Sequence, residues 1–250
     1  MLQVTKCQLS QVINATQLPA GRADVDCLNI RFKAQTKPEL LQSGFHPAAF
    51  AGSGLYALSF DDYLIYLGSY LGSGKGGAFF TGNVLSSRIW THVAAITMRG
   101  HRVHMSRKQL GKLAGQYGEQ HPLIQQLLDA PDAAKLHKDA GCLAPLNRMA
   151  FAAEHWDIFS QPISNDLLNR FQLSYVRLSA LPEGITPAQL KTKLLTIEET
   201  LIKELMPTCN STHIVHGAKA TQISAQAVSE RLLTEMQNFT GFAIAATTGK

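Results

Sequence analysis

Two β-rich apolar runs separated by two acidic residues constrain the fold of this chain more than any other feature. The runs are residues 54–60 (GLYALSF) and 63–70 (YLIYLGSY), and only Asp61 and Asp62 lie between them. A two-residue connection of this kind is typical of an antiparallel β-hairpin, since such loops provide the tight turn that joins paired strands. We therefore predict that the two runs pair as an antiparallel hairpin.

Periodicity and local composition predict the remaining elements. Further strands are expected at 27–33, 102–106 and 172–178, and a loop around 38–47. Residues 85, 89, 93 and 96 are apolar at a helical period, which predicts a helix over 84–98. Other helical segments are expected at 107–117, 122–129, 146–156 and 224–237.

The best-marked helix begins after Thr186. Thr186 can cap it, Pro187 suits its first turn, and Gln189 completes a capping box. Pro207 ends the apolar stripe, so the helix is expected to stop just before this residue.

Composition and cysteine usage limit the setting of the protein. The chain has 250 residues, of which 45% are hydrophobic and 16% charged, so a folded core is expected rather than disorder. Its net charge of +5 permits a nucleic-acid partner without requiring one. The four cysteines form no CxxC pair and no apolar run is long enough to span a membrane, so we expect a cytoplasmic protein without a signal peptide or membrane partner.

The glycine-rich stretch 66–77 (YLGSYLGSGKGG) first suggests a nucleotide-binding P-loop. A P-loop requires Ser or Thr after its Gly-Lys pair, but Gly76 follows Lys75, and Ser69 stands where the first glycine belongs. The predicted helix also begins too late to present its N-terminus to a phosphate. The HxxH pairs at 101–104 and 213–216 lack the further ligands that zinc needs. Both interpretations are therefore rejected.

A different set of residues has the types and spacing expected of a catalytic site. Tyr56 and Tyr66 lie on the two strands of the predicted hairpin, while Arg88 and His92 share one face of the next helix. Glu198 borders the apolar stripe of the capped helix, where a carboxylate without a partner is costly.

These motifs, taken in order, resemble the GIY-YIG nuclease superfamily. GLY (54–56) and YLG (66–68) look like its two name motifs, and Arg88 in SSRIWTH stands where its helix carries the phosphate-binding arginine. The segment 197–210 (IEETLIKELMPTCN) is similar to its closing pattern, with Glu198 at the metal-ligand position and Asn210 at the asparagine that braces the site.

The resemblance implies an α/β (α+β) fold in which helices flank a small central antiparallel sheet of about three strands. It covers 52–98 and 171–211, and we expect one domain over 1–250. The remaining parts are expected to be an N-terminal extension (1–51), a mainly helical insertion (99–170) and a C-terminal helix (212–250).

The resemblance also implies roles for individual residues. Tyr56 would be the general base, Tyr66 would position the phosphate or water, and His92 would relay a proton. Arg88 would stabilise the transition state, and Glu198 would hold one Mg²⁺ (or Mn²⁺) ion in each active site. A free tyrosine has a pKa near ~10, so a base role needs cationic groups or a metal to lower it. Further contacts to the substrate are expected from Lys75, Asn210, Arg99 and Arg102.

The expected function is a Mg²⁺-dependent DNA endonuclease of restriction or phage-defence type, because the Arg88–His92 pair is similar to that branch. Cutting both strands with one site per chain favours a homodimer. A structure-specific or single-strand nuclease on the same scaffold is one alternative. A non-catalytic nucleic-acid-binding module is the other.

Overall fold

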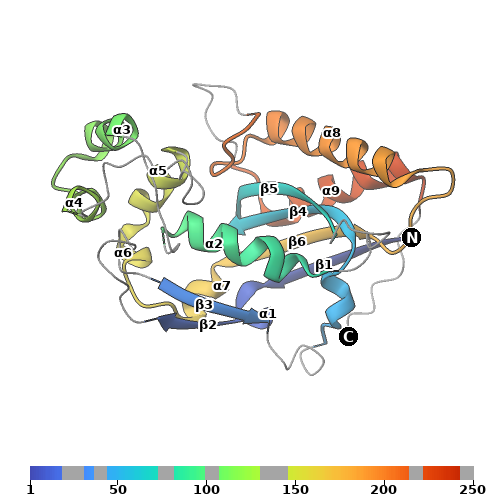
Figure 1. The fold of residues 1–250 in the computed structure, drawn as a ribbon, viewed down its shortest axis with the longest axis horizontal. Coiled ribbons are helices and arrows are strands. Elements are labelled where there is room, and N and C mark those ends of the chain that lie inside the picture. The colour runs from blue at the N-terminus through green and yellow to red at the C-terminus, as the bar shows by residue number, and fades with distance from the viewer. Residues whose placement is uncertain are drawn as a thin grey trace. The chain divides into compact units, whose positions relative to one another are not determined.

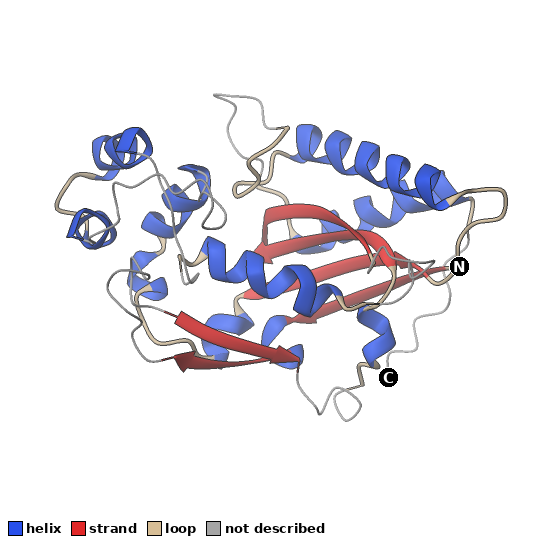
Figure 2. Cartoon of the chain, viewed as in Figure 1, coloured by secondary structure: helices blue, strands red, loops and turns tan. Residues whose placement is uncertain are grey.

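The computed structural model describes residues 1–18, 31–36, 44–72, 82–98, 107–129, 146–213 and 222–242. The described chain is a mixed α/β structure (Figure 2). It divides into two compact units, Met1–Asn14, Gln35–Arg88 and Asn165–Lys250 forming the first, and Ala15–Ala34 with Ile89–Ser164 the second.

The first unit is built on a four-stranded antiparallel sheet in the order β1-β6-β4-β5 (Figure 1). Its strands are β1 (Leu2–Gln8), β4 (Ser53–Phe60), β5 (Tyr63–Leu71) and β6 (Phe171–Leu178). The predicted antiparallel sheet is confirmed, but it has four strands rather than about three. The fourth strand, β1, comes from the segment that was expected to be an N-terminal extension, and it pairs with β6 from Leu2↔Leu178 to Gln8↔Gln172.

The predicted hairpin is confirmed as β4 and β5. Asp61 and Asp62 both have positive φ, 48° and 69°, which is the backbone conformation of a tight primed turn. The Arg170 side chain donates to the Asp61 carboxylate, with 2.7 Å between Nε and Oδ1. This contact ties the turn to the start of β6.

Helices cover one face of this sheet. The helices α8 (Pro187–Leu205) and α9 (Ala225–Thr240) lie over it (Figure 1). Their apolar faces pack on strand residues that share the same side of the sheet. The buried strand residues of this core are Leu2, Leu55, Ala57, Leu64, Leu67, Val176 and Leu178.

The capping signals of α8 form as the sequence predicts. Thr186 Oγ1 accepts from the backbone N–H of Gln189, and the Gln189 side chain accepts from the backbone N–H of Thr186. Met206 ends the helix in a left-handed conformation immediately before Pro207.

The remaining described elements are shorter. In the first unit these are α1 (Leu9–Val12), α7 (Asn165–Asn169) and a 3₁₀ turn at Pro47–Phe50. The second unit contains α2 (Trp90–Ile96), α3 (Arg107–Tyr117), α4 (Pro122–Asp129), α5 (Leu146–Glu154) and α6 (Trp156–Phe159). A two-stranded sheet pairs β2 (Ile13–Leu18) with β3 (Arg31–Thr36).

Most predicted helices are confirmed, and the one predicted at 84–98 begins with a π-helical turn, Leu85–Ile89, before α2. Of the strand predicted at 27–33, the structure describes only the last three residues, in β3. The strand predicted at 102–106 lies outside the described residues. Within the part of the chain that the structure describes, no helix is long and apolar enough to cross a membrane.

Candidate active site

The sheet face opposite α8 and α9 carries the two candidate tyrosines. Tyr56 pairs with Gly68 on β5 and with Tyr175 on β6, so it alternates with the helix-facing Leu55 and Ala57. The rings of Tyr56 and Tyr66 stack, with 6.2 Å between centroids and 23° between planes. We call this surface, defined by Tyr56, Tyr66, Tyr70 and Tyr175, the tyrosine face.

Gly68 leaves the space that the Tyr56 side chain occupies. A Cβ atom at position 68 would lie 2.6 Å from the Tyr56 hydroxyl and 2.7 Å from Cζ. Contacts this short require a shift of the ring or of the strand. A glycine at this position therefore has a direct packing reason, because the phenol of Tyr56 crosses the neighbouring strand there.

The pKa of Tyr56 moves away from the lowered value that a general base would require. Burial raises it well above its ordinary value, and the neighbouring Tyr66 and Glu198 raise it further, whereas Arg88 lowers it. Tyr56 is 2% exposed, so the loss of hydration outweighs one nearby cation. The phenol is therefore protonated at neutral pH in this structure.

Glu198 reaches the edge strand of the sheet from α8. Its Oε2 atom accepts a hydrogen bond from Ser69 Oγ at 2.5 Å. Burial raises the pKa of Glu198, while the Ser69 hydrogen bond, His213 and Arg88 act to lower it. The carboxylate is thus partly desolvated and held by a neutral donor.

Arg88 lies at the end of the π-helical turn Leu85–Ile89. Asn83 Oδ1 accepts from the backbone N–H of Leu85 at 2.8 Å and so caps the start of this turn. Ser87, next to Arg88, makes a long contact of 3.4 Å with the hydroxyl of Tyr70. Arg88 is exposed, and its charge opposes the effect of burial on the pKa of both Tyr56 and Glu198.

Asn210 is fully engaged with the backbone of β5. Its Nδ2 donates to the Leu67 carbonyl at 2.8 Å, and its Oδ1 accepts from the Leu67 N–H at 2.9 Å. Asn210 is 2% exposed, and the neighbouring N–H of Cys209 donates to the Ile65 carbonyl. The amide of Asn210 therefore braces the edge strand, and in this geometry it is not presented to a substrate.

The residues of the predicted site are distributed over the two units and the part of the chain that the structure does not describe. Tyr56, Tyr66, Arg88 and Glu198 belong to the first unit, whereas His92 lies on α2 in the second. Lys75, Arg99 and Arg102 lie outside the described residues.

Ser69 is the site residue that sequence reasoning missed. It appeared only as a mismatch in the rejected P-loop motif. Strand alternation offers the missing signal, because Ser69 follows Gly68 and so points to the face that α8 covers. A hydroxyl on that face, facing a helix that carries a half-buried carboxylate, is a natural partner for it.

A hydrated Mg²⁺ ion fits this donor set better than a metal enclosed by protein ligands. Across the described segments, no group of three or more His, Cys, Asp or Glu side chains could hold a metal ion. Mg²⁺ commonly binds one or two carboxylates, keeps several waters and takes substrate phosphate oxygens as ligands. Glu198 provides one such carboxylate.

Comparisons with known proteins do not identify a family for this chain. No protein-family model, curated protein or solved structure matches the chain. The function is therefore inferred from the residues and their geometry.

Proposed function

We propose that this protein is a metal-dependent endonuclease that hydrolyses phosphodiester bonds in DNA, of the restriction or phage-defence type. The observation that carries the proposal is the stacked pair Tyr56–Tyr66, with Arg88 and Glu198 close enough to change the pKa of the Tyr56 phenol. Tyr56 and Tyr66 come from the two strands of one hairpin, Arg88 from the turn that follows it, and Glu198 from α8, much further along the chain.

Phosphodiester hydrolysis requires the groups that this cluster contains. Positive charge must stabilise the phosphoryl oxygens, and the planar fork of Arg88 can donate two hydrogen bonds to them. The phenols of Tyr56 and Tyr66 orient the phosphate or the attacking water. Tyr56 is protonated in this structure, so removal of a proton from water by Tyr56 would require additional positive charge nearby.

Glu198 is the residue that would hold Mg²⁺. When bound there, Mg²⁺ would supply positive charge that stabilises the departing 3′-oxygen and offsets the charge of the Glu198 carboxylate. Ser69 keeps that carboxylate in place at the edge of β5.

The test is nicking of supercoiled plasmid in Mg²⁺ by wild type, Tyr56→Phe and Tyr63→Phe. Tyr56→Phe should lower the rate by about 10²–10³-fold, the range for loss of one hydrogen-bond donor placed at the reacting group. Tyr63 is 48% exposed at the start of β5, so Tyr63→Phe is a matched control and should keep the wild-type rate. Undiminished cleavage by Tyr56→Phe would remove Tyr56 from the mechanism.

Circular duplex, single-stranded and branched substrates separate the proposed function from its alternatives. Discrete bands from duplex DNA are expected of a restriction-type enzyme. Preferential cutting of single-stranded or branched DNA would instead indicate a structure-specific nuclease. DNA binding without cleavage under any divalent ion would indicate a non-catalytic module.

A further inference from the structure

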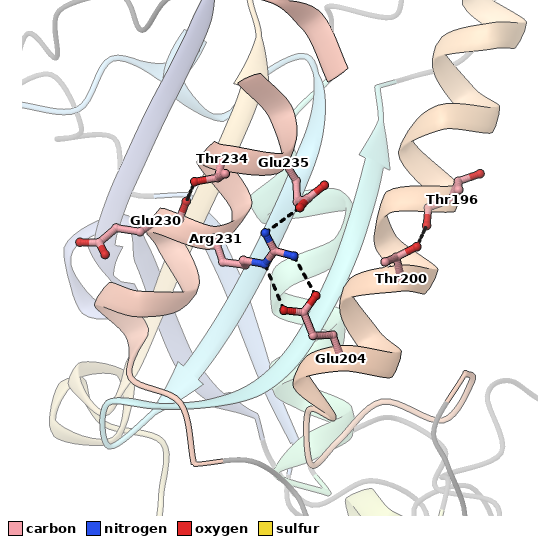
Figure 3. Close-up of polar contacts among 7 residues, drawn as sticks. All are labelled: Thr196, Thr200, Glu204, Glu230, Arg231, Thr234 and Glu235. Atoms are coloured by element: carbon pink, nitrogen blue, oxygen red, sulfur yellow. Dashed lines mark hydrogen bonds and ion pairs between the residues drawn. The ribbon is translucent and has the colours of Figure 1, made fainter. Parts of the chain in front are cut away.

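Two other arginines of the first unit, Arg170 and Arg231, have carboxylate partners. Arg170 donates to Asp61. Figure 3 shows Arg231 on α9 between Glu204 of α8 and Glu235 of α9. Arg231 Nη2 lies 2.8 Å from Glu204 Oε2, and Arg231 Nη1 lies 2.7 Å from Glu235 Oε1. Both arginines are partly exposed, so each of these ion pairs is also hydrated.

Arg177 differs from these two residues in burial and in partners. It is 8% exposed, and its guanidinium donates to the neutral Oε1 of Gln3. Its Nε–H has no hydrogen-bond partner among the described residues. No carboxylate among the described residues forms an ion pair with it.

This arrangement costs free energy in the absence of a ligand. Burial lowers the pKa of Arg177, which means that the charged form is less well solvated than in water, although the neighbouring Tyr175 opposes the shift. A buried charge is normally paired, and a buried donor normally has an acceptor. Among the described residues, Arg177 has no partner of opposite charge, and its Nε–H has no acceptor.

We propose that Arg177 binds a phosphate oxyanion on the tyrosine face. A guanidinium matches phosphate because its planar N–H groups donate two parallel hydrogen bonds to adjacent oxygens. The Nε–H provides one donor that no group of the described residues accepts from. An oxyanion supplies both the missing acceptor and the missing negative charge.

The position of Arg177 relates this anion site to the candidate active site. Arg177 pairs with Gly54, two residues from the pair Tyr175↔Tyr56, and therefore projects from the same sheet face. Two residues along a strand span about 6.5–7 Å. If the proposed nuclease function holds, on which this step rests, the ligand is a backbone phosphate of the nucleic acid beside the one that is cut.

Inorganic phosphate tests the anion site without requiring nuclease activity. Melting temperatures of wild type, Arg177→Met and Arg170→Met are compared in phosphate and in chloride at equal ionic strength. Wild type and Arg170→Met should gain about 2–4 °C in phosphate, and Arg177→Met should lose most of this gain. In chloride, Arg177→Met should melt no lower than wild type, since an apolar side chain replaces an unpaired buried charge.

Two results would overturn the anion site. One is an Arg177→Met variant that keeps the full stabilisation by phosphate. The other is a variant that melts well below wild type in chloride, which would show that Arg177 has a structural role. Arg177→Lys, which keeps the charge but not the planar fork, should retain only part of the stabilisation by phosphate.

DNA binding in EDTA distinguishes a nucleic-acid phosphate from a free one. Arg177→Met should reduce the slope of log K against log salt by about 1, the effect of one lost phosphate contact, and Arg170→Met should leave it unchanged. An unchanged slope for Arg177→Met would exclude the backbone phosphate as ligand. If wild type neither binds nor cuts DNA but keeps its stabilisation by phosphate, the proposed function fails and the anion site stands.

Discussion

Glu198 is a carboxylate held where water is partly excluded. Its surroundings favour the protonated form, because burial outweighs the hydrogen bond from Ser69 and the nearby positive charges. A carboxylate maintained at such a position, at the edge of a sheet and near Arg88, is poorly explained by stability alone. A role in binding positive charge explains it directly.

The pH dependence of the free energy of unfolding should show that burial of Glu198 disfavours its charged form. A folded-state pKa above the unfolded value makes ionisation costlier in the folded state, so Glu198 lowers stability as pH rises from about 4.5, its ordinary pKa, through its raised folded value. In EDTA, Glu198→Gln should therefore unfold at a higher temperature than wild type at pH 7. The difference should vanish as the pH falls below about 4.5, which thermal unfolding across pH 3–8 would measure. A variant less stable than wild type at pH 7 would show that the charged carboxylate stabilises the fold.

Gly68 and Ser69 show how neighbouring residues serve different parts of the site. Gly68 admits the phenol of Tyr56 on one face of β5, and Ser69 holds Glu198 on the other. Period-two alternation makes this division possible within one strand. The site therefore depends on the register of β5 as well as on the identities of its residues.

At the scale of elements, the edge of β5 is closed by the segment that follows α8. Asn210 bonds to both backbone groups of Leu67, and Cys209 bonds to Ile65. Edge strands have unpaired N–H and C=O groups, and this segment satisfies some of them. The same contacts fix the end of α8, and with it Glu198, against the sheet.

Loss of the Asn210 side chain should weaken the first unit measurably. Asn210→Ala leaves the N–H and C=O of Leu67 without their partner, at about 1–3 kcal/mol for each buried group. We expect the free energy of unfolding to fall by about 2 kcal/mol or more in urea titrations. Ser211→Ala is the control, since Ser211 is exposed and such substitutions usually change stability by less than about 0.5 kcal/mol. Equal stability of the two variants would show that the brace is not needed.

Local signals in the sequence predict several of these elements well. The Asp61-Asp62 turn and the capping box at Thr186 depend on residues within four positions of each other, and both form as predicted. The addition of β1 to the sheet depends on pairing across more than 160 residues, from Leu2 to Leu178, for which the local pattern has no signal. The upward shift of the Tyr56 pKa also has no local signal in the sequence, because burial of the side chain causes it.

At the scale of the whole molecule, the first unit separates its two sheet faces by role. One face packs the apolar stripes of α8 and α9, and the other carries the tyrosines together with Arg177, most of them buried. The proposed phosphate site lies on the tyrosine face. The proposed nuclease site combines the tyrosine face with Glu198 and Ser69, which meet on the helix side at the edge of β5.

The most direct test of the nuclease proposal is the initial rate of plasmid nicking by Glu198→Gln in Mg²⁺, compared with Glu199→Gln. Glu199 is the next residue, and its carboxylate accepts from Lys203 at 2.7 Å on the helix surface. We predict that Glu199→Gln nicks at the wild-type rate and that Glu198→Gln is slower by at least about 100-fold, because its side chain no longer holds the ion. Equal rates for Glu198→Gln and wild type, or cleavage by wild type that persists in EDTA, would contradict the proposal.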